Sequence, residues 1–214
     1  MNERIPDVVV RRLPIYARAL AHLAEDGVSV ISSLDLGKLL GVTPAQIRKD
    51  LSYFGEFGKQ GTGYDVVHLM TEIRRILGLD REWRMAIVGV GRLGRAIASY
   101  PGFANEGFRV VALFDSDPAK IGTALGDLTV RSMDELAVVA STERIDVGIV
   151  AVPAAQGQSV IDELVAVGVS GLLNYAPISV TVPSHVRVRD VDPVVALQSM
   201  TYYLKQNGED PASH

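Results

Sequence analysis

The sequence predicts an α/β protein in two parts, a helical N-terminal domain and a doubly wound parallel sheet, from three observations. Before about residue 80, apolar residues recur at helical spacing. After it, short β-branched runs alternate with helical stretches, and a glycine-rich turn follows the first of these runs. The 214-residue length suits a small domain plus a medium one. We therefore expect domains at 1–80 and 81–191, with the boundary within Gly78–Glu82.

Composition excludes several classes of protein. The longest apolar runs, at 85–90 and 147–153, are shorter than the roughly 18 to 20 residues that span a bilayer. Residues 2–7 carry acids where a signal peptide is basic, so a cytoplasmic protein is expected. The chain has no cysteine, which rules out disulfides, thiolate zinc sites, iron–sulfur clusters and thiol redox switches. We expect no metal site.

In the N-terminal part, helices are predicted at 15–25, 34–40, 44–54 and 66–77, and the last of these is expected to turn Val67 inward. Thr43 as the N-cap and Pro44 at the first helical position mark a strong helix start. The glycine-rich stretch 55–64 is typical of a tight hairpin. The second and third helices followed by this hairpin predict a winged helix-turn-helix, with a helical dimerisation domain as the alternative.

The third helix would bury Ile47, Leu51 and Phe54 and present a polar face. The side chains expected to contact base edges and phosphates are Gln46, Arg48, Lys49 and Ser52, with Lys59 and Gln60 at the hairpin tip. The chain carries a net charge of −4, and residues 1–80 are neutral, so any DNA contact must depend on this local patch. Asp50 and Glu56 should temper the patch, so affinity should need a dimer.

The second part alternates strands and helices. Strands are predicted at 85–88, 110–114, 147–152, 169–174 and 186–189, and helices at 92–99, 133–139 and 158–167. Continuous apolar strands that alternate with helices indicate a Rossmann-type parallel sheet covered on both faces. A last helix is predicted at 192–205.

A dinucleotide-binding fingerprint directly follows the first strand. Its residues are Gly89, Val90, Gly91, Arg92, Leu93 and Gly94. Gly89 permits the tight turn, Gly91 lets the backbone approach a pyrophosphate, and Gly94 lets helix and strand pack closely. Asp115, at the end of the second strand, would bind ribose hydroxyls and repel a 2′-phosphate, which favours NAD over NADP. The alternative is a glycine turn that binds no ligand.

No dehydrogenase machinery is evident, so we expect a protein that is not an enzyme. Of the four histidines, only His185 falls among the strands and helices of the second part, without a partner acid in a recognisable pattern. The residues after Val152 are needed to finish the sheet and leave no room for a substrate domain. Val152 and Pro153, in the loop 151–155, would form an apolar wall beside the nicotinamide.

The segment 42–59 resembles the redox-sensing transcriptional repressor family Rex, and so do 91–94, 100–103, 173–177 and 196–199. The resemblance implies a homodimer that binds palindromic double-stranded operator DNA and leaves it when NADH binds. It places Arg48, Lys49, Ser52, Lys59 and Tyr64 in the DNA-contacting element. Asn174 lies in one of the other matching segments, and we count this residue with the cofactor-binding residues. It also implies a domain-swapped C-terminal helix at 192–206 before a tail at 207–214.

The same resemblance implies a switch that links the two activities. Its residues map to Arg18, Tyr100 and either Asp190 or Asp192. NADH carries a neutral ring and NAD⁺ a cationic one, so an apolar pocket, completed by the partner's last helix, would penalise the oxidised form. We expect operator DNA and a second copy of the chain as partners, and neither a membrane nor a protein substrate. The alternatives are a dehydrogenase with a helical extension, and a nucleotide- or CoA-binding structural module.

Overall fold

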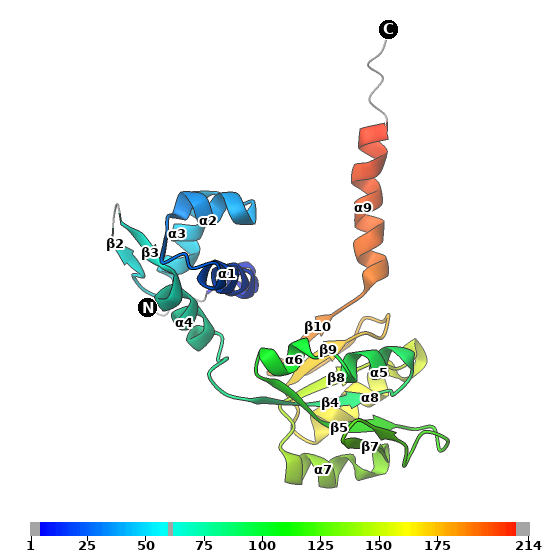
Figure 1. Cartoon of the computed structure of the whole chain (residues 1–214). Coiled ribbons are helices and arrows are strands. Elements are labelled where there is room, and N and C mark those ends of the chain that lie inside the picture. Colours follow the sequence, from blue (N-terminus) through cyan, green and yellow to red (C-terminus); the bar gives the residue numbers. More distant parts are fainter. Residues whose placement is uncertain (1–4, 60–61, 209–214) are drawn as a thin grey trace. The chain divides into compact units, whose positions relative to one another are not determined.

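The computed structural model describes residues 5–59 and 62–208 (Figure 1). The chain divides into two compact units, Met1–Arg81 and Glu82–His214, one residue beyond the boundary placed at 80. No helix among the described residues is long and apolar enough to cross a bilayer.

The first unit is a winged helix-turn-helix, as predicted. Its elements are α1 (Asp7–Glu25), β1 (Val30–Ile31), α2 (Ser33–Leu40), α3 (Pro44–Ser52), β2 (Gly58–Lys59), β3 (Gly63–Asp65) and α4 (Val66–Ile76). The strands form an antiparallel sheet in the order β1-β3-β2, and β2 with β3 forms the wing. Thr43 caps α3 by accepting a hydrogen bond from the Gln46 backbone N–H, and Ile47 and Leu51 are buried beneath it.

Two helices of this unit differ from the sequence prediction. Helix α1 begins at Asp7, well before the predicted start at 15, and runs through Pro14. Pro14 is exposed, and the helix is held by a buried stripe that begins at Val9 on the opposite face. Helix α4 was expected to turn Val67 inward, but Asp65 caps the helix so that Val66 is buried and Val67 is 55% exposed.

The second unit is a Rossmann-type sheet. Its elements are β4 (Trp83–Val88), α5 (Arg92–Ala98), α6 (Gly102–Asn105), β5 (Phe108–Asp115), β6 (Ala124–Leu125), β7 (Leu128–Ser132), the 3-10 helix η1 (Met133–Glu135), α7 (Leu136–Glu143), β8 (Val147–Val150), α8 (Ala154–Ala166), β9 (Gly171–Asn174), β10 (Arg187–Asp190) and α9 (Pro193–Gly208). The strand order is β10-β9-β8-β4-β5-β7-β6, parallel except for β6. The parallel strands thus follow the doubly wound dinucleotide-binding order, with its switch point between β4 and β8.

Both faces of the sheet are covered, as predicted. Ala86 and Val88 of β4 pack in one buried cluster with residues of α7 and α8. Met85 and Ile87, which point the other way along the same strand, pack in a second cluster with Ile97 of α5. Strands β6 and β7 and helix α6 were not predicted, because β7 buries only Val130 and carries little apolar signal.

Helix α9 carries apolar side chains that a single chain leaves uncovered. Every side chain described in it, from 193 to 205, is exposed. The aliphatic members are 54% to 64% exposed: Val194, Val195, Leu197, Met200 and Leu204. An apolar helix in this state needs another surface to cover it.

Candidate DNA-binding surface and dinucleotide cleft

The glycine turn between β4 and α5 has the geometry that a dinucleotide site needs. Gly89 has a φ of +95°, and a Cβ there would clash with the carbonyl oxygen of Ala151. A Cβ on Gly94 would clash with the carbonyl oxygen of Gly89, so helix and turn pack at a distance that only glycine allows. A Cβ on Gly91 would meet no atom within 4 Å. The backbone at Gly91 therefore faces open space in which an anion can approach.

This turn forms one wall of a cleft of about 510 Å³. The cleft lies at the carboxyl ends of β4 and β8, the switch point of the sheet, where such folds bind ligands. The predicted residues that the structure brings together here are Gly89, Gly91, Arg92, Leu93, Asp115, Val152 and Pro153. Val90 is buried beneath the turn and contributes its backbone N–H rather than its side chain.

Asp115 joins the glycine turn to the end of β5. One carboxylate oxygen accepts the Val90 N–H at 2.8 Å and the Lys120 ammonium at 3.0 Å, and the other accepts the Asp117 N–H at 2.9 Å. Burial raises the pKa of Asp115, but these donors outweigh it and hold the pKa below its ordinary value. A carboxylate offers about four acceptor positions, so one remains for a ribose hydroxyl.

Lys120 is a cleft residue that the sequence analysis missed. Its ammonium lies 3.0 Å from Asp115 and 3.7 Å from Asp117, and it lines the cleft. Together with the open backbone at Gly91 and the apolar wall at Val152 and Pro153, these groups fit a ribose, a pyrophosphate and a flat ring. No pattern in the sequence distinguished this lysine from others.

Asn174 lies away from this cleft, at the end of β9. Its amide nitrogen donates to the Ala176 carbonyl at 3.0 Å and to Asp190 at 2.8 Å, and its oxygen accepts the Ala176 N–H. It lines a second hollow of about 440 Å³ together with Asp190, Asp192 and the first turn of α9. Asn174 therefore supports the turn after β9 and the end of β10.

The candidate switch residues are distributed over both units. Arg18 is exposed on α1 of the first unit. Tyr100 follows α5 in the second unit and is 59% exposed, with its ring edge-to-face on Phe103 at 5.2 Å between centroids. The two candidate acids differ in their partners: Asp190 accepts the Asn174 amide, whereas Asp192 caps α9 through the Val194 N–H at 2.8 Å.

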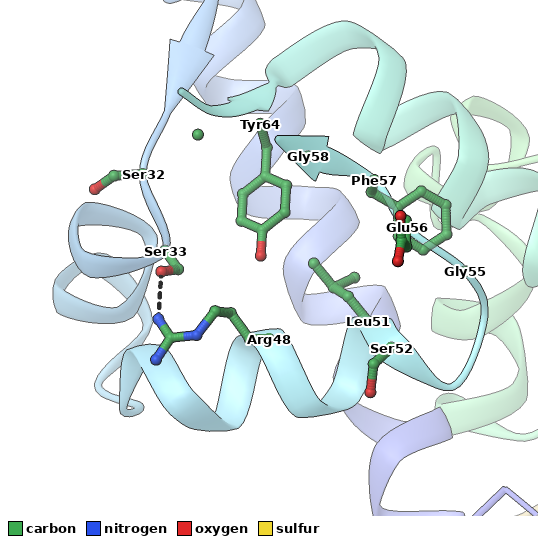
Figure 2. Close-up of a pocket in the computed structure, with 11 residues that line it drawn as sticks. Ser32, Ser33, Arg48, Leu51, Ser52, Gly55, Glu56, Phe57, Gly58 and Tyr64 are labelled. Carbon is green, nitrogen blue, oxygen red and sulfur yellow. Dashed lines mark hydrogen bonds between the residues drawn. The ribbon is translucent and has the colours of Figure 1, made fainter. Parts of the chain in front are cut away.

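In the first unit, a groove of about 960 Å³ runs between α3, the start of α2 and the wing (Figure 2). Arg48 projects from α3 across it and donates to the Ser33 hydroxyl at 2.8 Å. Ser52 and Tyr64 also line the groove. Tyr64 is 9% exposed, and burial raises the pKa of its phenol, so it is a neutral wall of the groove.

The remaining predicted DNA contacts have different settings. Lys49 is exposed on α3, and Gln46 is partly buried one turn before Asp50. Lys59 ends strand β2, while its side chain and all of Gln60 lie outside the described residues.

Asp50 does not temper the basic patch, contrary to expectation. Its side chain is fully buried beneath α3 and binds Arg12 of α1 in a bidentate ion pair at 2.6 and 2.7 Å. Tyr16 and Gln46 also donate to it, each at 2.6 Å. Burial raises the pKa of Asp50, but the donors outweigh it and keep the pKa below its ordinary value. The ion pair with Arg12 thus neutralises the charge of Asp50 inside the first unit. The sequence analysis missed this partner because it began the first helix at residue 15, after Arg12.

Comparison with known proteins identifies both units. Residues 4–52 match a family model described as a putative DNA-binding protein N-terminus, and 80–178 match one described as a CoA binding domain. The chain is 56% identical over 204 residues to the redox-sensing transcriptional repressor Rex of Chloroflexus aurantiacus, covering 95% of this chain and 96% of that protein. It is 45% identical to the Rex of Streptomyces griseus over 98% of this chain and 83% of that protein.

Two solved structures are similar to this chain over nearly its whole length. The crystal structure of RSP with β-NAD⁺ and operator DNA has a TM-score of 0.90 and 36% identity, covering 97% of this chain and 99% of that one. RSP with β-NADH has a TM-score of 0.87 and 34% identity, covering 96% and 97%. Similarity of this degree over nearly the whole length shows that the chain belongs to the Rex family of redox-sensing transcriptional repressors.

Proposed function

We propose that a homodimer of this chain represses transcription by binding a palindromic operator and leaves the operator when NADH binds. The observation that carries the proposal is that one chain holds both a winged helix-turn-helix, with a groove into which Arg48 projects, and a glycine-turn cleft that contains the ribose-binding candidate Asp115. Relatives of the same family are described as redox-sensing repressors, and RSP has been crystallised with NAD⁺ and operator DNA and with NADH.

On the DNA side, α3 would lie in the major groove. In this arrangement Gln46 and Lys49 would contact base edges and phosphates. Arg48 and Ser52, which line the protein groove, would contact the DNA backbone. Lys59, the last residue of β2, and Gln60, the next residue in the sequence, would contact the DNA backbone or the minor groove. Tyr64 supports these groups as a wall of the groove.

On the ligand side, the residues of the glycine turn, Gly89 to Gly94, would hold the pyrophosphate against the start of α5. Asp115 offers its remaining acceptor to the adenosine ribose, and Val152 and Pro153 form an apolar wall for the nicotinamide. An apolar wall favours the neutral ring of NADH over the cation of NAD⁺, which would lose hydration there. Asn174 contributes indirectly, by supporting the turn at Ala176.

The dimer would be built from α9. Its exposed aliphatic side chains match a helix that inserts into a partner copy, and Val194 and Val195 would then close the partner's nicotinamide pocket. Arg18, Tyr100 and one of Asp190 and Asp192 form the switch in this proposal. Asp192 already caps α9, so it can transmit a change in that helix, whereas Asp190 is held by Asn174.

A ligand that shifts this equilibrium must bind the two dimer states with different free energies. A shift from 1:99 to 99:1 takes about 5.5 kcal/mol, and two NADH molecules per dimer would share it. We propose that closure around NADH moves the recognition helices away from the roughly 34 Å spacing of half-sites one helical turn apart.

We also propose that the protein is not an enzyme and acts in the cytoplasm, where operator DNA would be found. The residues described as lining the cleft include no histidine. His22 and His68 belong to the first unit, and His185 lies in the connection between β9 and β10. Within 5–59 and 62–208, no cluster of acids and histidines could hold a metal ion.

The experiment is a titration of operator binding at fixed total nucleotide and a varied ratio of NADH to NAD⁺. The proposal requires operator binding to fall as NADH rises and to persist in NAD⁺. Equal effects of both nucleotides would refute redox sensing, and oxidation of NADH with a small carbonyl compound would favour a dehydrogenase.

A further inference from the structure

Asp50 occupies an unusual position for a fully buried carboxylate, since it belongs to α3, the helix proposed to enter the DNA groove, and lies on the buried face of that helix. Four hydrogen bonds reach it: two from Arg12, one from Tyr16 and one from Gln46. They occupy all of the roughly four acceptor positions that a carboxylate offers. Of these three donors, only Gln46 belongs to α3. Gln46 therefore connects the buried carboxylate to the side of α3 that is proposed to face DNA.

We infer that Asp50 sets the base preference of α3 by holding the Gln46 side-chain amide in one orientation. This inference rests on the proposed function. An ionised carboxylate only accepts hydrogen bonds, so the Gln46 atom that lies 2.6 Å from it must be the nitrogen. The bidentate ion pair with Arg12 keeps the carboxylate ionised. The amide therefore cannot turn over without placing two acceptors against each other.

The fixed orientation decides what Gln46 offers to DNA. One N–H is used by Asp50, which leaves the other N–H and the carbonyl oxygen. A donor and an acceptor on one planar amide match the N7 and N6 edge of adenine in the major groove. Gln46 is the third residue of α3, and the first residues of a recognition helix contact base edges. Asp50 is thus a positioning residue, and adenine is the base that it makes Gln46 prefer.

The test is selection of bound duplexes from a pool with randomised half-sites, using the full chain and the variants Asp50→Asn, Gln46→Ala and Tyr16→Phe. The wild type should prefer adenine at one position of each half-site by roughly 5- to 150-fold, the range of a good bidentate contact. Asp50→Asn and Gln46→Ala should both lose the preference at that same position. Tyr16→Phe also removes a donor to Asp50 but leaves the Gln46 contact, so it should keep the preference.

A second measurement covers the case in which Asp50→Asn fails to fold. In the wild type, one side-chain N–H of Gln46 should give an NMR signal shifted by its bond to the carboxylate, assigned by its loss in Gln46→Ala. Two signals at the positions of a free amide would overturn the inference. So would an unchanged base preference in folded Asp50→Asn, or a preference at the Gln46 position for a base other than adenine. If the wild type enriches no palindrome, the proposed function fails instead.

Discussion

Replacing Asp115 with asparagine tests how the cleft holds a dinucleotide. The carboxylate accepts two backbone N–H groups and one ammonium, on both of its oxygens. Asparagine has one oxygen, so its amide group would face either the Asp117 N–H or the Val90 N–H and Lys120. At least one backbone N–H then loses its acceptor, which costs about 1 to 3 kcal/mol of folding free energy in the second unit.

The effect on affinity is separate from the effect on stability. A hydrogen bond from a ribose hydroxyl to a charged acceptor is worth about 1.5 to 3 kcal/mol, so NADH affinity should fall roughly 10- to 150-fold. Fluorescence titration of NADH measures this change, and thermal unfolding measures the loss of stability. Operator binding without nucleotide should match the wild type, because Asp115 lies outside the winged helix-turn-helix.

Asp117→Asn is the matched control. Asp117 is 46% exposed and also interacts with Lys120, but it lies at the cleft surface rather than beneath the turn. Its replacement should change NADH affinity by less than about threefold, because water can solvate an exposed amide. If Asp115→Asn binds NADH as tightly as this control, the reasoning that assigns the ribose contact to Asp115 is refuted.

Three further predictions concern other parts of the chain. Gly94→Ala should abolish NADH binding, because the added methyl group would push the glycine turn away from α5. Operator binding without nucleotide should be unchanged. A variant that still responds to NADH would contradict the tight packing at this position. Lys49→Ala should weaken operator binding for all sequences and lower the salt slope by about one, measured by titration at several salt concentrations. Asp50 has a lowered pKa when folded, so its contribution to stability is complete above its unfolded pKa of about 4 and is lost as pH falls through the lower folded value. Acid unfolding of Asp50→Asn should lack this loss below about pH 4, and equal acid sensitivity would show that Asp50 is not the group responsible.

Much of the fold follows from patterns within short segments. The glycine turn and Asp115 were predicted because strand, turn, helix and acid follow one another in order, and the structure places the turn and the acid around one cleft. The third helix was predicted from Thr43 and Pro44, whose capping is local. Such features need no knowledge of distant contacts.

What the sequence did not predict depends on contacts between distant residues. Asp50 was expected to temper the DNA-contacting patch, yet it is neutralised by Arg12, 38 positions away on a helix that continues through Pro14. A proline on the exposed side costs the helix one hydrogen bond, which the packing of the inner face outweighs. Lys120 was missed for a different reason: it follows Asp115 by only five positions, but the loop after β5 that brings its ammonium to the carboxylate has no regular sequence pattern.

The free energy required for switching can be compared with the free energy that burial of the apolar side chains of α9 would contribute. Its five aliphatic side chains retain 54% to 64% of their exposure in the single chain. Full burial of such a side chain is worth about 1.5 to 3 kcal/mol, so covering the exposed part of each contributes about 1 kcal/mol or more. The whole helix then contributes on the order of 5 kcal/mol to a dimer, the same scale as the roughly 5.5 kcal/mol that a nearly complete shift requires. In the proposed homodimer both copies of α9 would be covered, which doubles this contribution to on the order of 10 kcal/mol. A movement that changes about half of that contact would then supply the free energy for switching without unfolding either unit.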